Sequence, residues 1–373
     1  MRRDEKTANR LEVLDGLRGL AIALVVFFHF WQKSWWNPLE KLPWLECLPR
    51  RGYFGVEIFF FLSGFCLYLP LARSSKWPGL RHYFSRRALK ILPSYWLCLV
   101  AALLLIPERE VAVNFWLHFF SHLSFLHSLT FETYGSIHGV FWSLGVEVQF
   151  YVLFPLLAIL FIRRPIIGPL LGWLLLALIA FFYRRWVVQG GMEGRGYTMQ
   201  MNQLPGFLDL FGGGMAAAAL TVVLQKRLTP HPAWSLLLVA GLAALLWLFR
   251  SADSHNQGHD AAISYQAAIR FPLALLLLLT TIGGALTPLR CGGLLRFLAA
   301  ISYNLYLWHT LVATLLQKAM GITEPWKVTD EGLRIRFTLV ALVVSLVVAA
   351  LLTYGFELPL LRRARRPISS FRE

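Results

Sequence analysis

The stretch that decides the fold is LDGLRGLAIALVVFFH, residues 14–29. It is an apolar run of helix length, yet it contains Asp15, Arg18 and His29. At roughly 100° per residue these three side chains share one face of a helix, and two glycines leave room for a neighbouring helix. Ionisable groups at membrane depth face the protein interior. The stretch therefore predicts a polar route through a bilayer, with His29 as the reactive group about 16 Å along the helix from Arg18.

The composition is that of an integral membrane protein. The 373 residues are 57% hydrophobic and only 15% charged, whereas about a quarter of the residues of a soluble domain are charged. Apolar runs that are long enough to cross a bilayer recur along the chain. They cover about residues 14–31, 53–72, 88–106, 139–162, 166–188, 204–224, 233–249, 268–287, 294–316 and 335–356. The predicted fold class is all-α, with about ten transmembrane helices in one bundle.

The net charge of +16 reflects basic residues beside the apolar runs, which set topology and contact anionic lipid. We therefore expect no nucleic-acid partner. The distribution predicts a multi-pass protein of the plasma (inner) membrane with both termini in the cytoplasm. It also predicts one domain over residues 1–373, with a helical core at about 11–360 and a short basic cytoplasmic tail at 361–373. The four scattered cysteines indicate neither a disulfide framework nor a zinc site.

A cluster of cations precedes the third apolar run in FSRRALKILPSYW, residues 84–96. Arg86 and Lys90 are spaced i,i+4, and Arg87 and Lys90 are spaced i,i+3, so the three side chains can converge at one end of a helix. Guanidinium and ammonium groups together suit phosphate oxygens. The alternative is that these residues only extend to the membrane surface and set topology.

Carboxylates occur in two other apolar runs. Glu147 shares a helix face with Ser143 and Tyr151 in GVFWSLGVEVQFYVLFP, because the three residues are four apart. Glu57 lies in GYFGVEIFFFLSGF, where it either neutralises a cation or belongs to a polar site. The runs between residues 166 and 287 contain mostly unbroken apolar sequence and are predicted to be scaffold.

Further polar residues are more ambiguous. In SYNLYLWH, a stripe of Ser302, Tyr306 and His309 could form hydrogen bonds toward the bundle centre. Glu357 is predicted to pair with a neighbouring arginine. The histidines of HFFSHLSFLH, residues 118–127, favour an amphipathic interfacial helix over a metal site, since no clear third ligand accompanies them. The Gly-rich segment 190–203 is either a flap or a connector.

Six motifs resemble, in order, those of the membrane-bound acyltransferase family 3. They are LDGLRGLAIALVVFFH, GYFGVEIFFFLSGF, FSRRALKILPSYW, GVFWSLGVEVQFYVLFP, SYNLYLWH and YGFELPLLR. Members transfer acyl groups, often acetyl, to hydroxyls of cell-envelope sugars, exopolysaccharides, antibiotics and similar acceptors. The resemblance implies an acyl-CoA donor from the cytoplasm and an essential helix-one histidine, here His29. The family's Arg-x-x-Arg pair maps to Arg87 and Lys90, so the second position departs from the pattern and Arg86 is a possible substitute.

The resemblance implies O-acyl transfer to a carbohydrate or another hydroxyl-bearing acceptor at the outer side of the membrane. Acyl-CoA, with acetyl-CoA first, is the expected donor substrate, and neither a tightly bound cofactor nor a metal is expected. Many members carry an extracytoplasmic hydrolase-like domain after the last helix, and none is expected here. The rival function is a transporter of a lipid-linked sugar or similar envelope precursor, because intramembrane charges also mark transport paths.

His29 either takes the acceptor proton or carries the acyl group itself. Glu147 or Glu57 is expected to hold the other ring nitrogen, as the third member of a catalytic triad does. Arg18 is expected beside the donor path, with neutralisation of Asp15 as its alternative role. The expected site consists of catalytic His29, Glu147 and Arg18, donor-binding Arg86, Arg87 and Lys90, and supporting Asp15, Glu57, Trp142, Ser143, Tyr151, Tyr306 and His309.

Overall fold

A computed structural model of the chain describes residues 11–106, 109–162, 166–254 and 259–364. The basic tail predicted at 361–373 lies outside these residues from 365 onward. All regular structure in the described residues is helical, as predicted. The chain divides into two compact units. Unit 1 comprises Met1–Phe28, Asn37–Trp77 and Ser143–Ala299, and unit 2 comprises His29–Trp36, Pro78–Trp142 and Ala300–Glu373.

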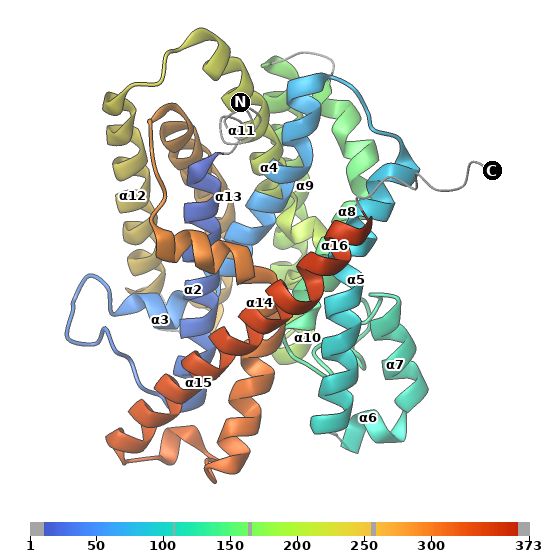
Figure 1. The fold of residues 1–373 in the computed structure, drawn as a ribbon, viewed down its shortest axis with the longest axis vertical. Coiled ribbons are helices and arrows are strands. Elements are labelled where there is room, and N and C mark those ends of the chain that lie inside the picture. The colour runs from blue at the N-terminus through green and yellow to red at the C-terminus, as the bar shows by residue number, and fades with distance from the viewer. Residues whose placement is uncertain (1–10, 107–108, 163–165, 255–258, 365–373) are drawn as a thin grey trace. The chain divides into compact units, whose positions relative to one another are not determined.

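Unit 1 is built around α11, which packs against α4, α9 and α13, while α12 lies along α13 (Figure 1). Most of α11 is buried, because small residues fill the sequence FGGGMAAAAL from Phe211 to Leu220. The elements of unit 1 are the first part of α2 (Glu12–Ser34), α3 (Cys47–Arg51), α4 (Phe54–Ser74), nearly all of α8 (Phe141–Ile162), α9 (Ile167–Gln189), α10 (Gly194–Met201), η1 (Leu204–Phe207), α11 (Leu208–Arg227), η2 (Pro232–Trp234), α12 (Ser235–Ser254), α13 (His259–Leu286) and the start of α14 (Gly293–Ala319).

Unit 2 holds α14 against α5 through backbone carbonyls. The Tyr303 hydroxyl donates to the carbonyl of Ile91 at 2.8 Å, and Cys98 Sγ lies 3.3 Å from the carbonyl oxygen of Leu307. The elements of unit 2 are the last turns of α2, α5 (Leu80–Leu105), α6 (Arg109–Val113), α7 (Phe115–Leu123), most of α14, η3 (Pro325–Lys327), α15 (Glu331–Leu351), the π-helix η4 (Leu352–Glu357) and α16 (Leu358–Ala364).

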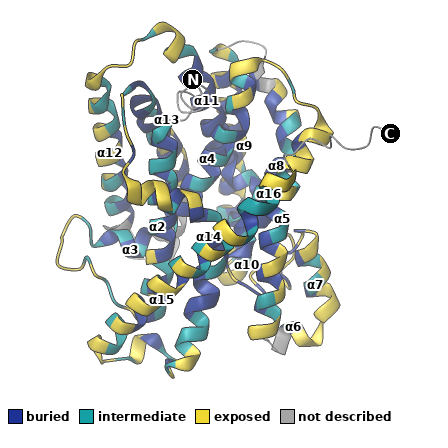
Figure 2. Ribbon diagram, viewed as in Figure 1, coloured by how far each residue is buried: buried dark blue, intermediate teal, exposed yellow. Residues whose placement is uncertain are grey.

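Within the described residues, nine helical segments are long and apolar enough to cross a membrane. They coincide with nine of the ten predicted runs. The tenth, predicted at 294–316, forms the helix α14 but is not among the nine, because Asn304, His309 and Thr310 make its centre polar. Apolar side chains such as Trp247 on α12 and Val343 on α15 are exposed, and Figure 2 shows exposed residues along both helices. Such surfaces suit a lipid environment.

Glycines set the close crossing of α4 and α11. A Cβ atom on Gly64 would lie 2.9 Å from the carbonyl carbon of Phe211, and one on Gly214 would lie 2.8 Å from the backbone nitrogen of Phe65. A Cβ atom on a third glycine, Gly19 of α2, would lie 2.5 Å from the carbonyl oxygen of Leu295. These contacts confirm that the glycines of the first two motifs permit close helix packing, as in membrane proteins generally.

Replacing Gly64 by alanine is expected to lower the free energy of unfolding by about 1–3 kcal/mol, because the backbone atoms that the new methyl group meets cannot move aside. Gly196 is the matched control, since nothing lies within 4 Å of a Cβ built there. The measurement is thermal unfolding of Gly64→Ala and Gly196→Ala in the same detergent. Equal unfolding midpoints would show that the tight crossing of α4 and α11 is not needed.

Candidate active site

Two histidine rings meet in unit 2. Nδ1 of His29, near the end of α2, lies 3.0 Å from Nε2 of His309 on α14, and the ring centroids are 4.9 Å apart. His309 is fully buried. Nδ1 of His309 faces the carbonyl oxygens of Leu305 and Tyr306, each at 2.9 Å. Both nitrogens of His309 are therefore engaged, one of them with His29.

These contacts fix where the protons lie when both rings are neutral. Carbonyl oxygens only accept hydrogen bonds, so Nδ1 of His309 carries its proton and Nε2 has a lone pair. That lone pair accepts from Nδ1 of His29, which must then carry the proton of its own ring. The remaining nitrogen of His29, Nε2, is left unprotonated. An imidazole in this tautomer can act as a base or a nucleophile at Nε2.

Glu147 or Glu57 was predicted to hold this ring nitrogen of His29, and His309 was predicted only as a supporting residue. In the structure the ring of His309 holds Nδ1 of His29, and Glu57 is bound to an arginine. The two histidines are 280 residues apart in sequence, so their pairing leaves no local pattern. The only sequence signal was the position of His309 on the polar stripe of SYNLYLWH.

A second cluster joins α5, α14 and the π-helix in unit 2. The Lys90 ammonium pairs with Glu357 Oε1, and Asn304 donates to Glu357 Oε2 at 2.8 Å and to Thr353 Oγ1 at 2.9 Å. The prediction that Glu357 pairs with an arginine was wrong, since its partner is Lys90. The π-helix that ends at Glu357 is a distortion that often occurs at functional sites.

The remaining donor-binding candidates lie on the same helix as Lys90. Arg86 is exposed and Arg87 is half-buried on α5. Within unit 2, α14 connects this cationic region with the histidine pair, because Asn304 and His309 are five residues apart and hence separated by about 7.5 Å along the helix axis. Lys90 keeps a counter-charge in Glu357, which weakens its attraction for a phosphate group.

Glu147 belongs to a separate group in unit 1. Its Oε1 accepts hydrogen bonds from Ser63 Oγ at 2.5 Å and from the hydroxyl of Tyr151, one turn along α8. Ser143 is buried one turn before it. The predicted shared face of Glu147 and Tyr151 is therefore confirmed. The structure adds Ser63 from α4 as a second donor to this carboxylate.

Arg18 and Asp15 are both half-buried on α2 in unit 1. Nη2 of Arg18 lies 3.5 Å from Cys66 Sγ on α4. The thiol sulfur of Cys66 is a weak acceptor, so among the described residues most of the hydrogen-bonding capacity of the guanidinium is unused. The guanidinium of Arg18 is thus suited to donate hydrogen bonds to an anionic partner.

The two remaining supporting residues lie near the start of α8 and on α14. Tyr306 is buried, and its hydroxyl donates to the carbonyl of Val140 at 3.0 Å. Trp142 is half-buried two residues later. The backbone carbonyl of Tyr306 is also one of the two acceptors for His309, so Tyr306 helps to fix the histidine pair from its own helix.

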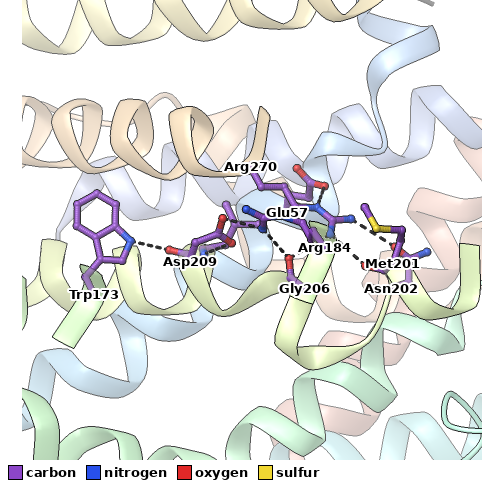
Figure 3. A network of polar contacts seen from close by, with 9 residues as sticks. Glu57, Trp173, Arg184, Met201, Asn202, Gly206, Asp209 and Arg270 are labelled. Atoms are coloured by element: carbon purple, nitrogen blue, oxygen red, sulfur yellow. Dashed lines mark hydrogen bonds and ion pairs between the residues drawn. The ribbon is translucent and has the colours of Figure 1, made fainter. Parts of the chain in front are cut away.

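Glu57 forms part of a buried ion network in unit 1 (Figure 3). Nε of Arg270 donates to Glu57 Oε1 at 2.9 Å, and Arg184 pairs with Asp209 at 2.8 Å. The two arginines share the carbonyl oxygen of Gly206, at 3.1 Å and 2.9 Å. Breaking such a buried pair costs about 3–5 kcal/mol. Of the two roles considered for Glu57, the structure supports neutralisation of a cation.

Arg184, Asp209 and Arg270 were missed, because each lies within a long run of apolar residues that was predicted to be scaffold. One of these residues, Arg270, also contacts the segment 190–203, which was predicted to be either a flap or a connector. Residues 194–201 form α10, and Arg270 binds the carbonyl oxygen of Met201 at 3.0 Å. The C-terminal end of this helix is therefore held by the buried ion network.

The histidines of residues 118–127 form contacts with oxygen atoms of the protein itself. Nδ1 of His122 lies 2.8 Å from the carbonyl oxygen of His118, and Nε2 lies 3.0 Å from that of Ser136. His118 contacts Ser136 Oγ at 2.9 Å. Both ring nitrogens of His122 are directed at carbonyl oxygens, so the single nitrogen lone pair of the neutral ring is not presented to a metal. Throughout the part of the chain that the structure describes, no three His, Cys, Asp or Glu residues group as metal ligands.

Burial lowers the pKa of His127 and that of His138, each to about 4. Their folded-state pKa lies below the unfolded value of about 6.5, so the unfolded chain takes up more protons as the pH falls. Stability is therefore complete above about pH 6.5 and is lost as the pH falls toward 4, by about 2 kcal/mol for each histidine at pH 5.

We expect amide hydrogen exchange in residues 115–142 to lose protection between pH 7.5 and pH 5, after correction for the intrinsic exchange rates. The segment α12 contains no histidine and serves as the internal control. Unchanged protection of residues 115–142 relative to α12 would show that these two rings do not titrate on unfolding.

The helices and the histidine pair define a polytopic membrane protein with a potential acid–base centre on a polar helix. The sequence of residues 11–354 matches the family model described as an acyltransferase domain. The chain belongs to this acyltransferase family, as its motifs predicted. The match includes both histidines of the pair and α5 with its cations.

Curated relatives are similar over most of the chain. The peptidoglycan O-acetyltransferase OatA of Listeria monocytogenes is 24% identical over 347 residues, which cover 84% of this chain and 51% of the relative. This chain therefore spans about half the length of that relative. The exopolysaccharide production protein ExoZ of Rhizobium meliloti is 27% identical, with 84% of this chain and 91% of the relative covered. No solved structure matches the chain.

Proposed function

We propose that this chain is a membrane O-acyltransferase that moves an acetyl group from acyl-CoA to a hydroxyl of a cell-envelope carbohydrate. The observation that carries the proposal is the contact of His29 with His309, within a chain of the acyltransferase family. The names of the relatives, a peptidoglycan O-acetyltransferase and an exopolysaccharide production protein, favour a polysaccharide acceptor. In this proposal both units form one functional domain in the inner membrane.

The proposed reaction uses Nε2 of His29 as a general base. It takes the proton of the acceptor hydroxyl while the hydroxyl oxygen attacks the thioester carbonyl carbon. The new C–O bond forms, the C–S bond breaks, and the CoA sulfur leaves with the proton returned by the imidazolium. His309 keeps the base in the required tautomer, and its lone pair stabilises the imidazolium as it forms. In the alternative route the acetyl group passes through Nε2 of His29 itself.

The donor is proposed to enter from the cytoplasmic side, where the phosphate groups meet Arg86 and Arg87. Planar guanidinium groups bind phosphate in a bidentate manner, which the ammonium of Lys90 cannot do. The pairing of Lys90 with Glu357 supports this assignment. Both termini then lie in the cytoplasm, and α2 runs outward toward His29, in agreement with the distribution of basic residues.

The test is transfer of label by the purified protein in liposomes, with labelled acetyl-CoA and isolated envelope polysaccharide. The proposal expects label in ester linkage to the polysaccharide. Movement of a lipid-linked sugar without acylation would instead support a transporter. Acid quenching in the absence of acceptor separates the two chemical routes, since only the covalent route leaves label on His29.

A further inference from the structure

Another cation is held one helical turn beyond His29 on α2. The Lys33 ammonium donates to Thr314 Oγ1 at 2.9 Å and to Gln317 Oε1 at 3.1 Å, both on α14 in unit 2. The side chain of Gln317 also donates from Nε2 to the carbonyl oxygen of Lys33 at 2.9 Å. Gln317 therefore uses both ends of its amide to hold this lysine in one position.

No carboxylate of the described residues forms an ion pair with Lys33. Among the residues that the structure describes, lysine ion pairs are formed by Lys90 and Lys327, whereas Lys33 contacts only neutral oxygens. An ammonium has three N–H donors, and Thr314 and Gln317 take two of them. A half-buried cation without a counter-ion attracts an anion more strongly than a fully hydrated one does.

The position of Lys33 indicates which molecule brings the anion. Residues four apart lie about 6 Å apart along a helix and on the same face, so an anion at Lys33 is close to the group that reacts at His29. The donor phosphates are already assigned to Arg86 and Arg87 on α5. A lysine that only extends to the membrane surface directs its ammonium to water, whereas this ammonium is bound by two side chains of α14.

We propose that Lys33 binds an anionic substituent of the acceptor sugar, a carboxylate or a phosphate, and selects charged sugars over neutral ones. The identification of the ligand as the acceptor rests on the proposed function. The proposal adds that the acceptor is an anionic carbohydrate, and that the residue that recognises it is separate from the residue that reacts with it.

The test is equilibrium binding of three small sugars to the purified protein at low salt, measured by calorimetry. Methyl glucuronide and methyl glucoside differ in one carboxylate, and glucose 6-phosphate supplies a phosphate instead. Of the two charged sugars, the one that the wild type binds more tightly is expected to bind about tenfold more tightly than methyl glucoside. This is the gain expected from a charge-assisted hydrogen bond. Which of the two charged sugars binds better identifies the anion.

Lys33→Met is expected to abolish the preference, because it keeps the length of the side chain but removes the charge. Lys33→Arg should retain it, and so should Lys318→Met, which removes an exposed lysine one residue after Gln317. The absence of a preference in the wild type, or an unchanged preference in Lys33→Met, would overturn the proposal. Binding needs no turnover, so His29→Ala should keep the preference for charged over neutral sugars. A failure of acyl transfer can therefore be distinguished from a failure of this binding site.

Discussion

Replacement of His29 by alanine is expected to lower the rate of acetyl transfer about a thousandfold, which is the usual contribution of a positioned general base. The loss should appear in kcat with little change in the KM for acetyl-CoA, since the donor phosphates are proposed to bind on α5. The measurement is the initial rate of label transfer in liposomes, over a range of acetyl-CoA concentrations.

The matched control for this variant is His82→Ala, which removes an exposed histidine of α5. It should transfer acetyl groups at the wild-type rate. His82→Ala should unfold at the wild-type temperature, whereas His29→Ala should be destabilised by about 1–3 kcal/mol, because it leaves Nε2 of the buried His309 without its hydrogen-bond donor; rates are therefore compared at a temperature at which both variants are folded. If His29→Ala retained more than about a tenth of the wild-type rate, His29 would be neither base nor acyl carrier.

Replacement of His309 by alanine is expected to lower kcat about a hundredfold. Without the lone pair of His309 Nε2, the ring of His29 is free to adopt the other tautomer, in which Nε2 carries the proton and cannot act as a base. Loss of the tautomer-fixing partner in a catalytic triad has an effect of this kind. The measurement separates kcat from KM, and the KM for acetyl-CoA should remain unchanged.

His309→Gln provides the rescue, because its amide oxygen can accept from Nδ1 of His29. We expect His309→Gln to transfer acetyl groups about tenfold faster than His309→Ala does, when the two variants have equal unfolding temperatures. A purely structural role of His309 predicts instead that activity follows stability in both variants. Equal rates for alanine and glutamine at equal stability would contradict the positioning role.

The helical fold was predictable because it follows from local features. Apolar runs of bilayer length are read directly from the chain, and the glycines of LDGLRGL and FFFLSGF mark close packing. The face shared by Glu147 and Tyr151 follows from their four-residue spacing alone, and the structure confirms it. The same reasoning identified His29 and placed His309 on a polar stripe of its helix.

The contacts between distant helices could not be predicted in this way. Lys90 meets Glu357 across 267 residues, and the sequence gives no reason to prefer Lys90 over a nearby arginine. Arg270 and Glu57 are 213 residues apart, and a single charge hardly changes the average of a long apolar window. Periodicity shows which face of a helix a side chain occupies, whereas its partner depends on how the helices are arranged.

The central claim is that His309 keeps His29 as a neutral ring with an unprotonated Nε2. Nitrogen-15 spectroscopy of the histidine-labelled protein in lipid at neutral pH tests it most directly, with the His29 signals assigned by comparison with His29→Ala. We predict a protonated Nδ1 and an unprotonated Nε2 in the wild type, and a mixture of tautomers in His309→Ala. A wild-type spectrum with the proton of His29 on Nε2 would contradict the account.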